Sequence, residues 1–502
     1  MLSLGNASLK RGIAPTNELS LQLLTAEISA LKCGWMLAYI LRIHTMPPSL
    51  MQEPPSKDYG LRSGVLSQIE IIAQSLANIA PTAGPAMVVP LVIASSGKAA
   101  WLVFLLATVG VVLIALNINV LARSSSSPGS LYGFVHEQFG RWPSVVAGWS
   151  LLIAYAGTAA AVTGGLTNYL HALVGGSSQP SIAFSSITTA IGLGVACILA
   201  YRDVRLSARL MLWTEAASIA LILVLFLLPG RGTVLHYDAA QLALTHFSAH
   251  QVQSGMVLAI FSFVGFESAT SMGAEAANPL RTIPRAVWAT ALFSGIFFLV
   301  SAYAENLALD GRLDNLAAAG APLQVMAKLR GVPLLAPLLA AGSAISFFAC
   351  ALASITAGAR TLFLMSRDGH ALRRCGKAHE RHQTPHAAVI AVAAAALIPA
   401  VLLCLRGVNP FDLNGWIGTV ATYGFLTAYG LACFAAPIKL RKQGLLSASA
   451  VLIAAGALII IGGTLWLSLD LSAPPPNNWL PFLYLGLLAA GTLVSGVRRR
   501  RI

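Results

Sequence analysis

The sequence predicts an all-α polytopic membrane protein. Only 10% of its 502 residues are charged, whereas about 25% are charged in an average soluble domain. Its mean hydropathy is +0.74. Apolar runs of roughly 20 residues, the length of a helix that crosses a bilayer, recur along the chain. Membrane β-barrels instead have short segments of alternating polarity, a pattern that this sequence lacks.

The apolar runs predict about twelve transmembrane helices. Each run is long enough to span the hydrocarbon core, and most are separated by short polar or proline-containing segments. The expected spans cover residues 68–95, 99–121, 142–174, 181–200, 208–229, 251–273, 286–308, 333–364, 386–405, 414–436, 446–468 and 480–497.

The basic residues predict the orientation of these spans. The formal net charge is +14, and the positive charges cluster beside the apolar runs. Cytoplasmic loops are enriched in Lys and Arg. If the N-terminus is inside, most of the 32 basic residues fall on the cytoplasmic side. We therefore expect a protein of the cytoplasmic membrane with both termini in the cytoplasm. The same rule explains the positive charge without a nucleic-acid partner.

The first 60 residues are expected to form a poorly structured N-terminal extension. Glu27 and Lys32 interrupt the moderately apolar stretch 21–41, and no convincing cleavage site follows it. Met46 and Met51 are alternative starts.

The sequence carries no pattern typical of an enzyme or a metal site. The six cysteines include no CxxC pair, and several lie inside apolar runs. Four histidines gather in the loop 366–386, but their spacing matches no common metal motif. The stretch "GTAAAVTGG" (157–165) predicts close helix packing by small residues. We therefore expect no metal, no cofactor and no enzymatic activity.

Two of the predicted spans carry residues that interrupt a helix. Pro81, Gly84 and Pro85 lie near the middle of span one, and Gly265 lies in span six. Proline removes a backbone donor and clashes with the preceding turn. In many transporters two five-span repeats each begin with a broken helix, and the freed backbone groups bind the substrate. The alternative is a pair of simple kinks.

Three segments resemble one known family. The stretch "FSFVGFESATSMGAEAANPLRTIPRA" (261–286) combines an aromatic-rich GFE segment with NP-x-R-x-I-P-R-A, while "RDVRLSAR" (202–209) and "SRDGHALRR" (366–374) match two further loop motifs. In this order and spacing they resemble the amino acid–polyamine–organocation permease superfamily over roughly residues 60–500.

The resemblance implies a fold and an activity. The implied fold is leucine-transporter-like, with a 5+5 inverted repeat over residues 61–230 and 231–436, and two more helices and a short basic tail over 437–502. The implied activity is secondary transport of amino acids or related amines, coupled to protons or working by exchange. Two alternatives stay open: a non-transporting sensor or partner subunit with this fold, and a sodium-coupled symporter.

The two interrupted segments are the predicted substrate site. Many family members carry a G-S/T-G segment in span one, whereas this chain has "APTAGPA", in which both prolines lack an amide donor. In span six the resemblance makes Phe261 an aromatic gate, with ordinary helix packing as the alternative. The expected substrate-binding residues are Ala80, Thr82, Ala83, Gly84, Phe261, Ser262, Phe263 and Gly265.

Two acids inside the spans are candidates for coupling or structure. An intramembrane carboxylate is costly and usually marks a functional position or a buried pair. Glu267 either carries a proton or accepts hydrogen bonds from an opened helix end; because GFE recurs through the family regardless of coupling, we favour the structural role. Glu215 is the second acid. Some proton-coupled relatives carry a lysine in span five, near Ser218 here, and its absence leaves a sodium site at Ser218 open.

Charged and polar residues at the cytoplasmic end of the first and sixth spans have two interpretations. Glu275, Arg281 and Arg285 form either an inner gate or a charged surface loop. Glu70, Gln74 and Asn78 share one face of span one at intervals of four residues, and they either line an inner vestibule or pack against a neighbouring helix.

Overall fold

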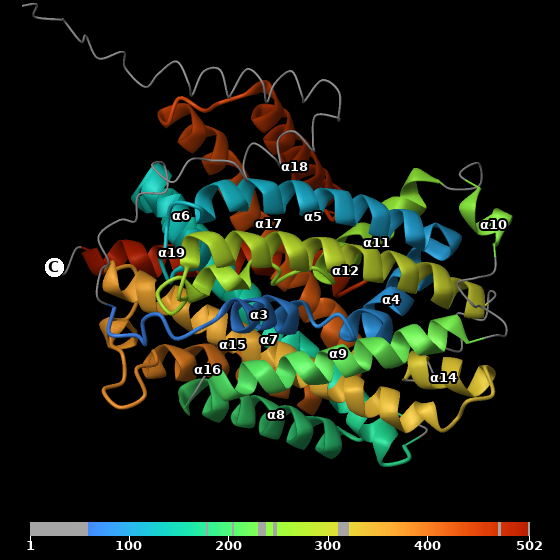
Figure 1. Cartoon of the computed structure of the whole chain (residues 1–502). Helices are drawn as coiled ribbons and strands as arrows, with labels where there is room; N and C mark the ends of the chain where they lie inside the picture. The colour runs from blue at the N-terminus through green and yellow to red at the C-terminus, as the bar shows by residue number, and fades with distance from the viewer. Residues whose placement is uncertain are drawn as a thin grey trace, which may run out of the picture.

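The computed structural model describes residues 59–176, 179–202, 205–228, 237–243, 248–309, 321–469 and 473–499. Within these ranges the protein is a bundle of helices (Figure 1), and the β-pairing is a single isolated bridge between Leu66 and Ala276. Among the described residues, nine helical stretches are long and apolar enough to cross a membrane, and two shorter apolar helices cover 212–227 and 251–261. The prediction of a helical, multi-pass membrane protein is confirmed. Helix bounds do not test the 5+5 layout or the domain limits, which stay predictions.

The described elements follow in chain order. They are α3 (Gln68–Ile79), η2 (Gly84–Val88), α4 (Val89–Ser96), η3 (Gly97–Ala99), α5 (Ala100–Ala122), α6 (Ser130–Phe139), α7 (Arg141–Leu173), α8 (Ile182–Arg202), α9 (Arg205–Leu227), α10 (Ala239–Leu242), α11 (Ala249–Phe261), η5 (Ser268–Met272), α12 (Pro279–Leu309), α14 (Pro322–Leu329), α15 (Leu335–Arg367), η6 (Arg373–Gly376), α16 (His386–Leu405), α17 (Pro410–Lys442), α18 (Ala448–Leu467), η7 (Asn477–Trp479) and α19 (Leu480–Arg499).

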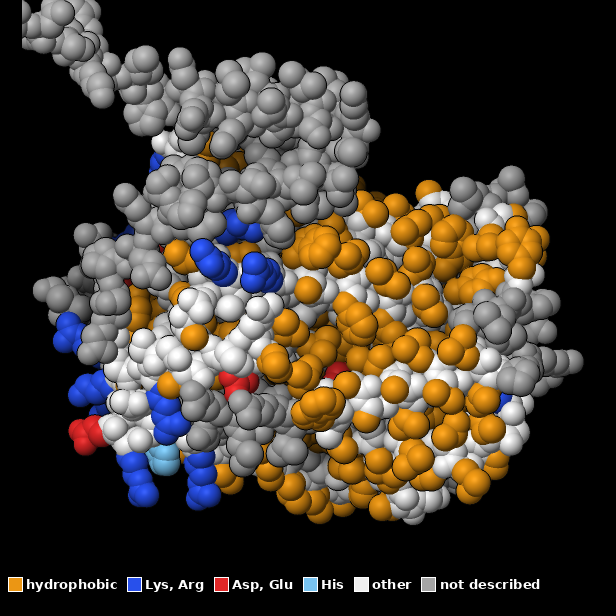
Figure 2. Space-filling view, in the orientation of Figure 1, with side chains coloured by type: hydrophobic (Ala, Val, Ile, Leu, Met, Phe, Trp, Pro, Cys, Tyr) orange, Lys and Arg blue, Asp and Glu red, His pale blue; other side chains and the backbone are white. Residues whose placement is uncertain are grey.

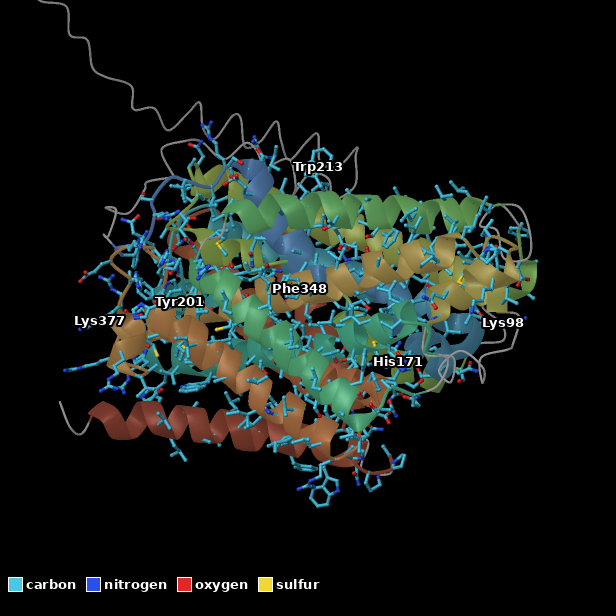
Figure 3. All side chains as sticks on the ribbon, turned by 90° about the horizontal axis from the view of Figure 1, so that it is seen from below. Lys98, His171, Tyr201, Trp213, Phe348 and Lys377 are labelled. Carbon is cyan, nitrogen blue, oxygen red and sulfur yellow. The ribbon has the colours of Figure 1, made fainter. Side chains whose placement is uncertain are left out.

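Hydrophobic side chains cover much of the outer surface of the bundle. Figure 2 shows them over most of one face, with Lys and Arg gathered at one end. Large apolar residues are exposed on several helices: Ile187 on α8 is 56% exposed, and Trp213 on α9 and Ile459 on α18 are each 73% exposed. A lipid bilayer is the solvent that such a surface requires. Lys98 and Lys377, which the orientation rule assigns to opposite sides, lie near opposite ends of the bundle (Figure 3).

The first span opens where its prolines predict. Helix α3 starts with a capping box between Ser67 and Glu70 and ends at Ala80, which has φ 49°. The left-handed conformation costs an L-residue about 1–2 kcal/mol, and the following Pro81 disfavours the α conformation at Ala80. The chain resumes as the π-helical turn η2 and continues as α4.

The sixth span opens over a longer stretch than its single glycine suggested. Helix α11 ends at Phe261, residues 262–267 form successive turns, and the chain then continues as the 3₁₀ helix η5. Gly265 has φ +96°, a conformation that glycine adopts without steric penalty. The predicted span 251–273 is therefore α-helical only in its first half.

Small residues bring the central helices together. Helix α7 packs most extensively against α17 and α15. A Cβ on Gly164 would lie 2.2 Å from the carbonyl oxygen of Pro410, and one on Gly165 would lie 2.3 Å from the ring of Phe347. The close packing predicted for "GTAAAVTGG" is therefore present.

The loop 366–386 contains one buried histidine. His370 is buried and its Nδ1 lies 2.8 Å from the hydroxyl of Tyr132, which also donates to Asp368 at 2.7 Å. Burial lowers the pKa of His370, which favours the neutral imidazole. Among the described residues, no group of three or more His, Cys, Asp or Glu side chains could hold a metal ion.

Some predictions from the sequence fall partly outside the described ranges, among them residue 229 of the span 208–229 and residues 500–502 of the basic tail. Residues 1–58, nearly all of the expected N-terminal extension, lie outside them. So do residues 203 and 204 of the motif "RDVRLSAR".

The packing of α7 on α17 predicts a selective effect of one methyl group. Gly164→Ala places its Cβ against a backbone oxygen, which cannot move aside as a flexible side chain can. We expect a loss of about 1–3 kcal/mol in stability, seen as a lower thermal midpoint in detergent. The control is Gly463→Ala on α18, where a Cβ meets nothing within 4 Å. An equal midpoint for both variants contradicts the packing argument.

Candidate functional site

A small cavity lies between the two opened spans. Its volume of about 20 Å³ has room for roughly one water molecule, so a larger ligand requires side chains or helices to move. Five of the predicted substrate-binding residues line it: Ala80, Ala83, Gly84, Phe261 and Ser262. The other lining residues are Asn78, Ile79, Val88, Thr158, Val162, Val264, Phe347, Cys350 and Asn414.

Three predicted substrate-binding residues lie outside this lining. The amide of Thr82 donates to Oε1 of Glu215 at 2.7 Å. The ring of Phe263 packs edge-on against Phe298, with centroids 5.1 Å apart. Gly265 faces Asn78, because a Cβ on it would lie 2.0 Å from Asn78 Nδ2.

The backbone donors of span one are mostly used within the protein. The amide of Ala83 donates to the carbonyl of Ala80 at 2.8 Å, and the amide of Ala86 to that of Thr82 at 3.2 Å. The prolines at 81 and 85 have no donor. The Thr82 amide is engaged by Glu215, so side chains have to supply much of the polar recognition in the cavity.

Span one and span six are joined by hydrogen bonds between their opened segments. The hydroxyl of Ser75 donates to the carbonyl of Phe266 at 2.8 Å and accepts from the amide of Ala269 at 3.0 Å. The hydroxyl of Ser268 donates to the carbonyl of Gln74 at 3.3 Å. Side-chain hydroxyls therefore satisfy backbone groups that the interrupted helix leaves unpaired.

Glu267 accepts hydrogen bonds from two tyrosines. The hydroxyl of Tyr155 on α7 donates to Oε1 at 2.9 Å, and the hydroxyl of Tyr429 on α17 donates to Oε2. The carboxylate is fully buried. Both oxygens thus tie the opened stretch of span six to the central helices, which agrees with the structural role.

Three polar atoms in the cavity wall lack a hydrogen-bond partner among the described residues: Asn78 Nδ2, Thr158 Oγ1 and Asn414 Oδ1. In each of the two asparagine side chains the second polar atom is hydrogen-bonded within the protein. Asn78 Oδ1 accepts from Ser354 at 2.6 Å, and Asn414 Nδ2 donates to the carbonyl of Ala161 at 3.1 Å. Three residues of the lining, on three helices, thus carry an amide donor, a hydroxyl and a carbonyl acceptor that have no partner among the described residues. Buried polar atoms are rarely left unsatisfied, so these are places for a ligand or water.

Sequence reasoning missed most of this wall. Thr158 and Val162 lie in the segment that was assigned to helix packing alone. Phe347 and Cys350 on α15 and Asn414 on α17 carry no motif of their own. Asn78 was noted only as one residue of a polar face. The signal available was that Asn78 and Asn414 are amides within spans, where polar side chains are rare.

Glu275 pairs with a residue on another span. Nε and Nη2 of Arg360 lie 2.6 and 2.8 Å from its two carboxylate oxygens, and both side chains are buried. Arg281 and Arg285, the two basic residues of the predicted inner gate, are exposed. Beside this pair, the amide of Leu66 donates to the carbonyl of Glu275 at 2.9 Å, so the segment before α3 is joined to the loop before α12.

Ser218 does not lie in the cavity wall. Its hydroxyl donates to the carbonyl of Thr214 at 2.8 Å, and it packs against Gly342 of α15. A sodium site at this position stays a prediction.

A profile of the family described as "Amino acid permease" matches residues 70–492. The chain belongs to the amino acid permease family. This confirms the resemblance read from the three motifs. As a family member, this permease transports amino acids or related compounds through a membrane.

Similar proteins include several transporters. A methylthioribose transporter of Bacillus subtilis is 24% identical over 81% of the permease and 87% of its own length. The branched-chain amino acid permease BcaP of Lactococcus lactis is 26% identical over 60% of the permease and 68% of its own length. Human cationic amino acid transporter 4 is 26% identical over 66% of the permease and 53% of its own length.

The tyrosine contacts of Glu267 predict how substitutions act. Glu267→Leu removes the acceptor of two buried hydroxyls: Tyr429 loses its partner, and Tyr155 keeps only a 3.5 Å contact with Ser130. An unpaired buried hydroxyl costs about 1–3 kcal/mol, so we expect a clear fall in the thermal midpoint. Glu267→Gln keeps an acceptor and the side-chain shape, and we expect a smaller fall, with transport and its pH dependence retained. Glu380→Leu, an exposed acid, is the control. Loss of pH dependence in a folded Glu267→Gln protein contradicts the structural role.

Proposed function

We propose that this permease is a secondary active transporter of amino acids or small amines in the cytoplasmic membrane. It works by alternating access, with proton coupling or exchange, and both termini are cytoplasmic. The observation that carries the proposal is the cavity between the two opened spans, with unpaired polar atoms of Asn78, Thr158 and Asn414 in its wall.

The chemistry of the cavity fits a small zwitterion or amine. Asn414 Oδ1 accepts from an ammonium group, and Asn78 Nδ2 donates to a carboxylate or carbonyl oxygen. Phe261, Phe347 and Val162 contact the apolar part of the substrate. Phe261 already packs against Gly418, so its ring lies between α11 and α17 and moves when a substrate enters.

We assign the cytoplasmic gate to Glu275 and Arg360. The segment before α3 lies beside the cytoplasmic loop, since a Cβ on Gly60 would lie 3.4 Å from Ala378. The bridge of Leu66 to Ala276 and the ion pair therefore close the same end of the bundle, where Lys377 lies (Figure 3). Opening toward the cytoplasm separates these contacts.

Uptake into proteoliposomes tests the proposal. The panel is labelled leucine, arginine, putrescine and methylthioribose, with a proton gradient, a sodium gradient, or unlabelled substrate inside. We expect accumulation or exchange of at least one amine or amino acid. Accumulation that follows sodium alone supports the symporter alternative. Neither uptake nor exchange by folded protein supports a sensor or partner subunit and overturns the proposal.

A matched pair of substitutions on α7 tests the cavity. Thr158→Val removes the unpaired hydroxyl, and one lost hydrogen bond of about 1 kcal/mol corresponds to about a fivefold higher KM. Thr163 is equally buried, but its hydroxyl is bonded to the carbonyl of Ala160. We expect Thr163→Val to leave the KM nearly unchanged. Equal KM values for Thr158→Val and wild type contradict the assignment.

Loosening the proposed gate exposes the cavity from the cytoplasmic side. We expect Glu275→Gln to speed the reaction of Cys350, which lines the cavity, with an impermeant thiol reagent in inside-out vesicles, in a background where the other cysteines are serine. Lys439→Gln, which loses a longer 3.8 Å ion pair with the half-exposed Glu137, is the control. Equal rates in the two variants argue against the gate.

A further inference from the structure

Glu305 is a buried acid that the proposed site does not use. It lies near the C-terminal end of α12 and is fully buried, and neither carboxylate oxygen has a hydrogen-bond partner among the described residues. The other acids buried in the centre of the bundle differ. Glu215 accepts from an amide, Glu267 from two hydroxyls, and Glu275 from an arginine.

No cation on the neighbouring described elements neutralises Glu305. Helices α4 and α5 and the short helices η2 and η5 carry no titratable side chain, and Glu70 on α3 lies at the opposite end of span one. Lys98 on η3 and Lys328 on α14 are exposed. Arg330, just after α14, donates to carbonyls of Leu225 and Leu228.

Tyr169 on α7 does not satisfy the carboxylate either. It interacts electrostatically with Glu305, but its hydroxyl donates to the carbonyl of Ala86 at 2.7 Å. An ionised carboxylate buried without a partner costs several kcal/mol. Glu305 is therefore stable in this position only after it takes up a proton or another cation.

The position of Glu305 connects it to the outer half of span one. Phe298 and Glu305 are seven residues apart and thus share one face of α12. Phe298 touches Gly84, where a Cβ would lie 2.3 Å from its ring, and α12 also packs against η2 and α14. Asn306 donates to the carbonyl of Gly97 at 3.2 Å. Movement of the segment 84–97 therefore changes the access of water to Glu305.

We propose that Glu305 is the proton-binding site that couples transport to the proton gradient. Its carboxylate binds one proton when the outer half of span one moves away from α12 and admits water. The neutral acid is then stable in the closed protein. The same proton leaves to the other side when the cavity beside Gly84 opens there, which restores the carboxylate. This inference rests on the proposed transport function and names its coupling residue.

A comparison of proton-driven accumulation with exchange distinguishes this coupling role of Glu305 from a structural role. In proteoliposomes with an imposed pH gradient, we expect Glu305→Gln to abolish accumulation of the panel member that wild type concentrates. Exchange against preloaded substrate persists, because the glutamine mimics the protonated acid. Glu305→Asp retains a carboxyl group, and we expect it to retain part of the substrate accumulation. If the Glu305→Gln protein fails to fold, the Glu305→Asp variant is measured in its place. Glu137→Gln is the control and accumulates like wild type.

A second readout needs no substrate. Infrared spectroscopy of wild type near neutral pH is expected to show a protonated carboxyl band that Glu305→Gln lacks and Glu137→Gln keeps. If wild type takes up nothing from the panel, the proposed function fails, and this band still decides whether Glu305 holds a proton. Two results overturn the inference: unchanged accumulation and pH profile in Glu305→Gln, or a sodium-driven accumulation that this variant loses.

Discussion

Inside a bilayer, backbone groups have to find their hydrogen-bond partners within the protein, because lipid offers none. This chain interrupts two spans and satisfies the interruptions with side chains from elsewhere. Ser75 bonds to both Phe266 and Ala269 across the two opened segments. Glu215 holds the Thr82 amide. The cavity exists because these contacts keep both openings at the same place in the bundle.

The same constraint explains why acids lie inside so apolar a bundle. Glu215, Glu267 and Glu275 each accept from a donor in a distant part of the chain: Glu215 from the opening of span one, Glu267 from α7 and α17, and Glu275 from α15. Each of these contacts fastens an opened segment, or the loop that follows it, to a neighbouring helix. Glu305 differs because it has no such donor among the described residues. A carboxyl group without a donor stabilises nothing in its ionised form, and this is why we assign it to the movement of a proton.

Local sequence chemistry predicts where the two spans open, but it does not predict which distant residues meet at the cavity. Ala80 opens the first span because Pro81 follows it, and Gly265 can adopt its positive φ because it has no Cβ; both effects depend only on a residue or its sequence neighbour. Asn414 and Phe347 reach the cavity through the relative rotation of helices distant in the chain, which local patterns do not encode. For the same reason Arg360, not a neighbour such as Arg281, is the partner of Glu275. Glu305 was visible as an acid within a span, but only packing shows that it lacks a donor.

A cryo-electron microscopy structure of the permease in lipid nanodiscs, bound to a substrate that it transports, tests the central claim most directly. The account predicts density for the substrate between the two opened spans, within hydrogen-bond distance of Asn78, Thr158 and Asn414, with the ring of Phe261 displaced. Substrate density elsewhere, with these three side chains untouched, would contradict it.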